Sequence, residues 1–97
     1  MKIQIPHLNY TITLKDAFHK DMGNRPSCQR ISHGESILWL PKKHRKEIAT
    51  VSHEVIHVLQ NICESRQINF TQETEHVAYL MMYIMAKIFN LTLVNID

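Results

Sequence analysis

The 97-residue sequence is poor in the residues that break a chain or link its segments, with only two glycines and three prolines. A chain of this length fits one domain with one modest core, and so few breakers leave little room for linkers. Apolar residues make up 44% of the sequence and charged residues 21%, which is ordinary for a folded protein and argues against a disordered adaptor. We therefore expect a single domain over residues 1–97.

Long apolar runs are also missing. Residues 1–8 lack the continuous apolar segment of a secretory signal, and the longest apolar stretch, 77–89, is interrupted by Lys87 and too short to cross a bilayer. The two cysteines, Cys28 and Cys63, are far apart and form no CxxC pair, which fits reduced thiols better than a disulfide scaffold. We expect a soluble, cytoplasmic protein with no membrane partner.

Charge of one sign does not dominate either, because the formal net charge is +2. One basic run, PKKHRKE at 41–47, could contact nucleic acid. It is short and has neither interleaved aromatic residues nor a recognised nucleic-acid motif, so we interpret it as the solvated entrance to a helix. Nucleic acid is not expected as a partner.

Alternation of apolar and polar residues predicts short strands in the first forty residues. KIQI (2–5) and YTITL (10–14) alternate in this way, and CQRIS (28–32) and SILWL (36–40) flank a turn and form a predicted hairpin. Residues 15–26 show only a weak pattern and are expected to form a loop. These segments predict a small N-terminal antiparallel sheet.

The apolar period changes to 3.6 from residue 48 onward, which indicates a helix with a wide core-facing stripe. The residues of this stripe are Ile48, Val51, Val55, Val58, Leu59 and Ile62. The helix should end near residues 63–65, and Thr71 is a suitable N-cap for a second helix to about Asn90. LTLV at 91–94 is a final short strand or a tail. The predicted fold class is α+β, with the sheet packed on two main helices.

The polar side of the first helix carries His53, Glu54 and His57, which form the motif HExxH. Residues four apart on a helix differ by about 40°, so the two histidines project side by side and can share one metal ion. Glu54 is turned about 100° from His53, where a carboxylate can accept a proton from a water on the metal. A chance match in a histidine-rich helix is the alternative. Core histidines would lie within the apolar stripe, however, whereas these two lie opposite it.

A catalytic zinc site needs a third protein ligand. Cys63 is at the position of the third ligand in the extended motif HExxHxxGxxH, but Gln60 replaces its glycine and Cys63 points toward the core. The second helix offers Glu75 and Glu73. We favour Glu75, because Glu73 lies near the helix start, where a carboxylate simply stabilises the N-terminus. Glu64, His76 or no third ligand are the remaining alternatives.

The combination of ILWLP, HEVIH and a second-helix glutamate in E-x-x-A-Y resembles small zinc metallopeptidases encoded by tailed bacteriophages. It is also similar to minigluzincins, single-domain proteins of this size, and the similarity covers residues 37–89. The resemblance implies a minimal zincin-like domain with Zn²⁺ as cofactor. It further implies His53, His57 and Glu75 as ligands, Glu54 as general base, and the host cytoplasm as the location.

These features predict a zinc metallopeptidase that hydrolyses peptide bonds in a peptide or protein substrate. We expect an extended substrate to pair with an edge strand at 37–40, a common way to bind peptide backbone. The substrate-binding residues would be Ile37, Leu38, Trp39 and Leu40. Tyr79 is a candidate oxyanion donor, although Tyr83, His76 and His33 are equally available. The alternative function is a non-catalytic zinc-binding phage protein that binds a host factor.

Overall fold

The computed structural model describes residues 1–90, so the strand or tail expected at 91–94 lies outside the described residues. It contains the strands β1 (Lys2–Ile5), β2 (Tyr10–Lys15), β3 (Ser27–Ser32) and β4 (Glu35–Trp39). Its helices are α1 (Ile48–Arg66) and α2 (Thr74–Phe89), with short 3₁₀ turns η1 (Pro6–Leu8) and η2 (Lys42–His44). All four predicted strands and both predicted helices are present.

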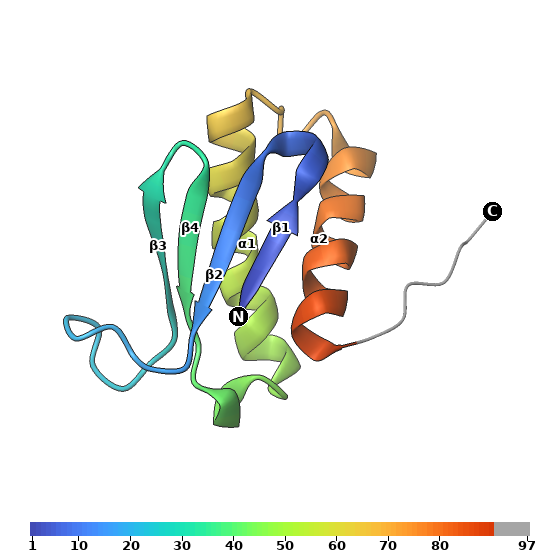
Figure 1. Ribbon diagram of the computed structural model, residues 1–97. Helices are drawn as coiled ribbons and strands as arrows, with labels where there is room; N and C mark the ends of the chain where they lie inside the picture. The colour runs from blue at the N-terminus through green and yellow to red at the C-terminus, as the bar shows by residue number, and fades with distance from the viewer. Residues whose placement is uncertain (91–97) are drawn as a thin grey trace.

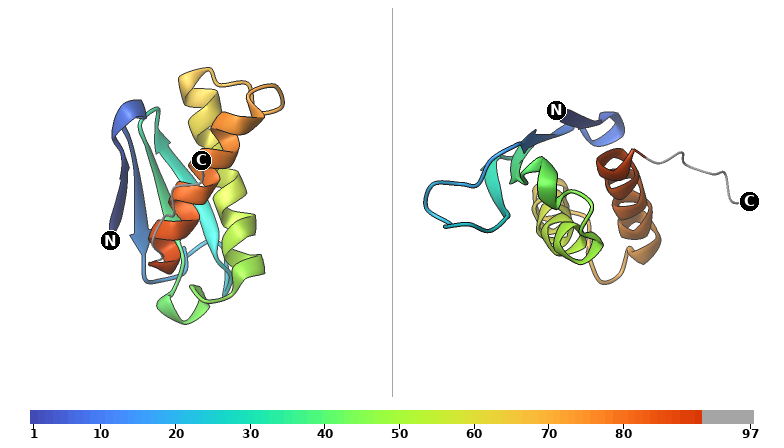
Figure 2. Two further views of the ribbon diagram at one scale, coloured as in Figure 1. Left: turned by 90° about the vertical axis from the view of Figure 1, so that its right-hand side faces the viewer. Right: turned by 90° about the horizontal axis from the view of Figure 1, so that it is seen from below.

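The molecule has two layers, a four-stranded sheet and two helices that cover one of its faces (Figures 1 and 2). The predicted α+β class is therefore confirmed. The strand order is β1-β2-β4-β3, and β2 pairs with β4 in parallel, so the sheet is mixed and not wholly antiparallel as expected. The loop after β2 carries the chain past the position of β4 to the sheet edge, and the β3–β4 hairpin then returns it beside β2.

The prediction that residues 37–40 form an edge strand is wrong. β4 pairs with β2 on one side, where Leu14 faces Leu38, and with β3 on the other, where Cys28 faces Leu38. The hydrogen-bonding groups of β4 are therefore already used, and the strand cannot add a substrate backbone. In the part of the chain that the structure describes, the edge strand on this side of the sheet is β3, which pairs with β4 alone.

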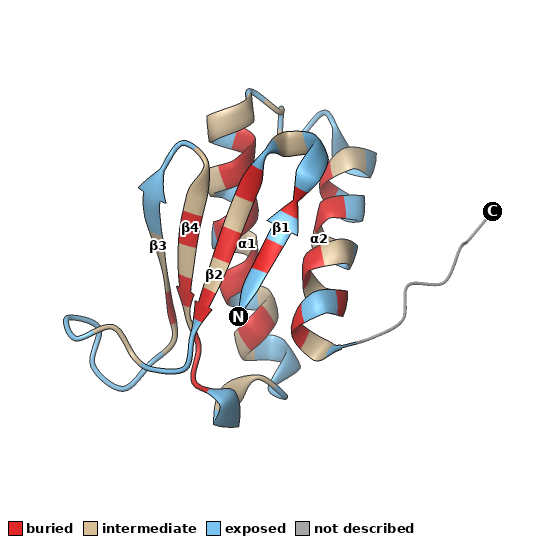
Figure 3. Ribbon diagram, in the orientation of Figure 1, coloured by how far each residue is buried: buried red, intermediate tan, exposed pale blue. Residues whose placement is uncertain are grey.

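The core lies between the inner face of the sheet and the two helices (Figure 3). The sheet contributes the buried residues Ile3, Ile5, Tyr10, Ile12, Leu14, Leu38 and Leu40. The helices contribute Val51, Val55, Val58, Leu59, Ile62, Cys63, Val77, Leu80, Ile84 and Ile88. The predicted stripe of α1 is thus confirmed, with two differences. Ile48, the first residue of the helix, is 67% exposed, and Glu54 is buried.

Specific polar contacts set the ends of the helices. α1 continues to Arg66, whose Nε donates a hydrogen bond to the Leu8 carbonyl oxygen at 2.7 Å and so ties the helix to the β1–β2 connection. The N-cap of α2 is Glu73, two residues later than the expected Thr71, because the Asn69 side chain accepts hydrogen bonds from the backbone of Thr71 and Gln72 and forms a tight turn there. Neither helix of the described chain is long and apolar enough to span a bilayer.

Candidate metal centre

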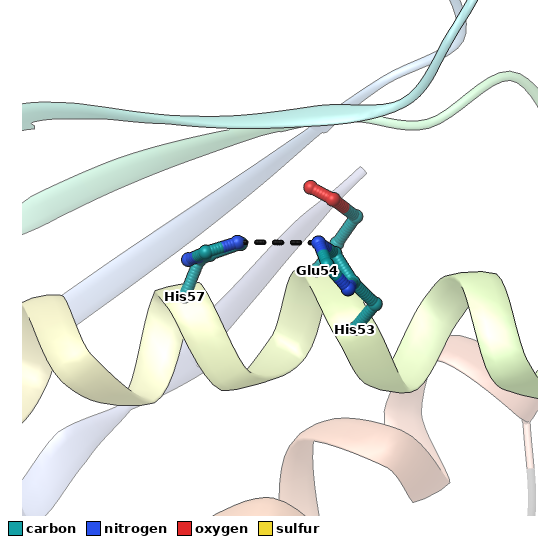
Figure 4. Close-up of side chains that lie close together, drawn as sticks. All are labelled: His53, Glu54 and His57. Atoms are coloured by element: carbon teal, nitrogen blue, oxygen red, sulfur yellow. Dashed lines mark hydrogen bonds between the residues drawn. The ribbon is translucent and has the colours of Figure 1, made fainter.

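The two histidines of the HExxH motif meet on the same side of α1, one turn apart (Figure 4). The Nε2 atoms of His53 and His57 are 3.3 Å apart, and the ring centroids are separated by 5.0 Å. One ligand atom from each of His53, Glu54 and His57 lies within 4.8 Å of the others. The structure therefore brings the predicted pair and the intervening glutamate together as a group that could hold a metal ion.

The separation of the two ring nitrogens fits a single bound ion. With Zn–N bonds of 2.0–2.1 Å and a tetrahedral angle, two imidazole ligands place their nitrogens about 3.3–3.4 Å apart. The observed distance between the Nε2 atoms is 3.3 Å. This separation is the one that a shared ion requires, and at this distance one ring N–H can also donate a hydrogen bond to the other ring nitrogen.

His57 has a second contact that favours the required tautomer. Its Nδ1 lies 3.3 Å from Oε1 of Gln60, one turn further along α1. If Nδ1 carries the hydrogen and donates it to this oxygen, the lone pair of the ring is left on Nε2, which faces His53. Gln60, which replaces a glycine of the longer zinc motif, thus has a role that the sequence alone does not show.

Glu54 differs from the two histidines in its burial. It is only 5% exposed, although the helical wheel places it on the polar side of α1. Burial raises the pKa of the Glu54 carboxyl, while nearby His53, His57 and Arg25 lower it in part. A buried carboxyl of this kind, placed beside two histidines that could hold a metal ion, is suited to exchanging a proton.

The group opens into a cleft of about 770 Å³ between α1 and β3. One wall comes from the loop before β3 and from the strand itself: Met22, Arg25, Pro26, Ser27, Cys28 and Arg30. The other wall comes from α1: Ala49, Thr50, His53, Glu54, His57, Gln60 and Asn61. The cleft therefore runs beside the edge strand β3, and not beside residues 37–40 as predicted.

A buried hydrogen-bond network connects the cleft to the sheet. The Asn61 side-chain amide donates to Ser36 Oγ at 3.2 Å and to Cys28 Sγ at 3.5 Å. Ser36 Oγ also lies 2.6 Å from the Tyr10 hydroxyl, and both residues are at most 1% exposed. Burial, followed by the Glu54 carboxylate, raises the pKa of the Cys28 thiol to about 12, so Cys28 is a protonated thiol at neutral pH.

The structure does not bring the glutamates of the second helix to this group. Glu75 is exposed in the first turn of α2, and Glu73 is its N-cap and accepts a hydrogen bond from the Asn69 backbone at 2.7 Å. In Figure 4 the three side chains point to one side of α1, and α2 lies on the opposite side. Within residues 1–90, no residue of α2 lines the cleft. The geometry gives Glu75 no support as the third ligand.

The other candidates lie elsewhere. Cys63 is 4% exposed, as expected for a core residue, and Glu64 pairs with Arg30 at 3.0 Å. Tyr79 lines a separate apolar pocket of about 220 Å³ between η1 and α2, together with Pro6 and Leu80. The described part of α2 thus presents neither a ligand nor an oxyanion donor to the cleft.

No family model, curated protein or solved structure matches this chain. The likeness to phage metallopeptidases therefore remains a resemblance.

Proposed function

We propose that this protein is a zinc-dependent peptidase whose active site is the cleft between α1 and β3. The observation that carries the proposal is the 3.3 Å separation of the His53 and His57 Nε2 atoms, with a buried Glu54 beside them. Two imidazoles at the spacing of a tetrahedral zinc site and an adjacent carboxylate are the main parts of a hydrolytic metal centre.

The two histidines would hold Zn²⁺ through their Nε2 atoms, and Gln60 would keep His57 in the matching tautomer. When bound, the metal supplies Lewis acidity, which lowers the pKa of water and polarises a carbonyl group. Glu54 accepts the proton of the attacking water and then transfers it to the leaving amine. Its raised pKa favours this second step, because the carboxyl holds the proton more readily than an exposed glutamate does.

The edge strand β3 provides the place for a substrate. Among residues 1–90, no strand pairs with its outer edge, and Ser27, Cys28 and Arg30 line the cleft beside the histidine pair. An extended peptide that adds to this edge would lie between β3 and α1, with its backbone hydrogen-bonded to the strand. β3 thus takes the role that the sequence analysis gave to residues 37–40.

The resemblance implies Glu75 as the third zinc ligand, and this remains a separate hypothesis. In the described arrangement Glu75 lies outside the group, so the first turn of α2 would have to reach the cleft. The change Glu75→Gln tests this directly. Loss of bound zinc would support Glu75 as a ligand, whereas unchanged zinc affinity would remove it from the site.

A second candidate function is a non-catalytic metal site, as in a phage protein that binds a host factor. The observation that favours it is that Glu54 itself offers a ligand atom within 4.8 Å of both histidines. A Glu54 that binds the metal would complete three protein ligands from one helix. It would then not serve as the general base, so the two functions exclude each other at this residue.

The change Glu54→Gln separates the two functions, and Glu35→Gln is the matched control because Glu35 lies on β4 and does not line the cleft. Zinc per chain would be measured by mass spectrometry, and cleavage with a quenched peptide library. The peptidase proposal expects E54Q to keep its zinc and lose at least about 100-fold in cleavage. Loss of zinc in E54Q would favour the non-catalytic site. A zinc-loaded wild type that cleaves no peptide would contradict the peptidase proposal.

A further inference from the structure

One end of the molecule concentrates positive charge. Segments 15–26 and 41–47 contain seven of the eleven Lys and Arg residues but only three of the nine acidic residues. We call these seven cations the basic rim: Lys15, Lys20, Arg25, Lys42, Lys43, Arg45 and Lys46. The remainder of the chain has more acidic than basic residues, so the small net charge hides a strongly asymmetric distribution.

The two segments form one continuous surface. The Lys42 backbone N–H donates a hydrogen bond to Asp16 Oδ1 at 2.8 Å. The Lys43 ammonium lies 5.7 Å from the centroid of the Phe18 ring, and the same ring lies 5.6 Å from that of His44. These contacts join the loop after β2 to the 3₁₀ turn before α1. The cations of both segments therefore act together on an approaching charge.

The basic rim continues into the cleft through Arg25. This residue lines the cleft together with His53 and Glu54, is exposed, and forms no ion pair or hydrogen bond with any residue between 1 and 90. The other cleft-lining arginine, Arg30, is paired with Glu64 at 3.0 Å. Arg25 thus places a positive charge, which also acts on the Glu54 carboxyl, at the end of the cleft next to the N-terminus of α1. At the other end, Arg30 and Glu64 form an ion pair.

We infer that the basic rim selects acidic peptide substrates. The aspartate or glutamate side chains would lie on the segment of the peptide that extends from the cleft toward residues 16–26 of the protein. The inference rests on the proposed peptidase function and deepens it. A peptide is favoured over nucleic acid because the rim leads into a cleft beside the free edge of β3, which offers backbone hydrogen bonds. Each exposed charge pair changes affinity by about 1.4- to 5-fold, so a peptide with several acidic residues gains about tenfold.

The test uses the zinc-loaded E54Q protein, which can bind peptides without cleaving them. Three labelled peptides of equal length, rich in Glu, Gln or Lys, are titrated at low salt and at high salt. We expect the Glu peptide to bind about tenfold more tightly than the Gln peptide, and the difference to shrink at high salt because exposed charges are screened. Adding Arg25→Gln should lower the affinity for the Glu peptide about threefold. Lys87→Gln, a cation on α2 outside the rim, should leave it unchanged.

Equal affinities for the Glu and Gln peptides, or equal effects of R25Q and K87Q, would overturn the inference. So would a DNA oligonucleotide that binds more tightly than the Glu peptide and displaces it, since this would assign the basic rim to nucleic acid. Cleavage of Gln peptides by the wild type as readily as Glu peptides would contradict acidic selection but leave the peptidase function intact. A wild type that binds no zinc would contradict the peptidase function, whichever peptide it prefers.

Discussion

Ser36 is the centre of the buried network below the cleft, and we predict that the change Ser36→Ala destabilises the protein by about 2 kcal/mol. Its hydroxyl oxygen contacts the Tyr10 hydroxyl at 2.6 Å and the Asn61 amide at 3.2 Å. Ser36 is 0% exposed and Tyr10 is 1% exposed, so water has no access to replace the lost contact. The network joins β2, β4 and α1. The loss of stability on breaking it therefore measures how much these hydrogen bonds contribute to holding α1 on the sheet.

The magnitude follows from the group that each variant leaves without a partner. In S36A the buried Tyr10 hydroxyl loses its hydrogen bond, at a cost of about 1–3 kcal/mol, while Asn61 keeps its contact to Cys28 Sγ. In Tyr10→Phe the hydroxyl itself is gone and Ser36 still accepts from Asn61, so a loss of about 1 kcal/mol is expected. The double variant should cost less than the sum of the single variants, with a coupling energy of about 1 kcal/mol.

Urea unfolding of the wild type, both single variants and the double variant measures this cycle. For a domain of this size, 1 kcal/mol corresponds to a change of about 4–8 °C in Tm, so thermal unfolding gives an independent reading. Strictly additive losses would refute the account, because they would show that Ser36 and Tyr10 do not depend on each other. A stability of S36A equal to that of the wild type would refute it as well.

Two further predictions concern the cleft. Gln60→Ala should weaken zinc binding about tenfold, because His57 loses the contact that favours its metal-binding tautomer. The control Gln72→Ala should leave zinc binding unchanged. Equal zinc affinities of the two variants in a titration would contradict this role of Gln60. Cys28 should react with iodoacetamide far more slowly in the folded than in the urea-unfolded protein, since a pKa of about 12 instead of 9.0 leaves about a thousandfold less thiolate at pH 8. Peptide mass spectrometry measures the rate of alkylation in each state. Equal rates in the two states would show that the Cys28 thiol is not buried in the folded protein.

Local patterns in the sequence were sufficient to predict the secondary structure. The alternation in KIQI and YTITL and the apolar stripe of α1 reflect which side chains face the core, and both were confirmed. The side-by-side placement of His53 and His57 follows from helix geometry alone, so it was predicted correctly too. The ends of the helices were less accurate, because side chains such as Asn69 compete for the backbone groups there.

Strand order could not be obtained in the same way. Nothing in SILWL shows that β4 is inserted between β2 and β3, since that depends on how the loop at 16–26 crosses the end of the sheet. The edge strand was therefore misplaced. The same long-range arrangement buries Glu54, brings Cys28 and Asn61 together and positions Arg25 at the cleft. These residues are distant in sequence and no local pattern connects them.

The placement of Glu75 shows the limit of reasoning from a motif. The resemblance implies it as the third ligand, but whether it reaches the histidines depends on which side of α1 the second helix packs. In this structure α2 packs on the side away from the cleft (Figure 4).

The most direct test of the account is the zinc content of the purified protein, compared with that of His57→Ala and of His76→Ala as the matched control. His76 lies on α2, where its ring contacts that of His7 at 5.9 Å, outside the metal group. We predict about one zinc ion per chain for the wild type and H76A, and at least about a 100-fold loss of zinc affinity for H57A. A wild type that takes up no zinc, or an H57A variant that binds it as tightly as the wild type, would contradict the central claim that His53 and His57 together bind the metal.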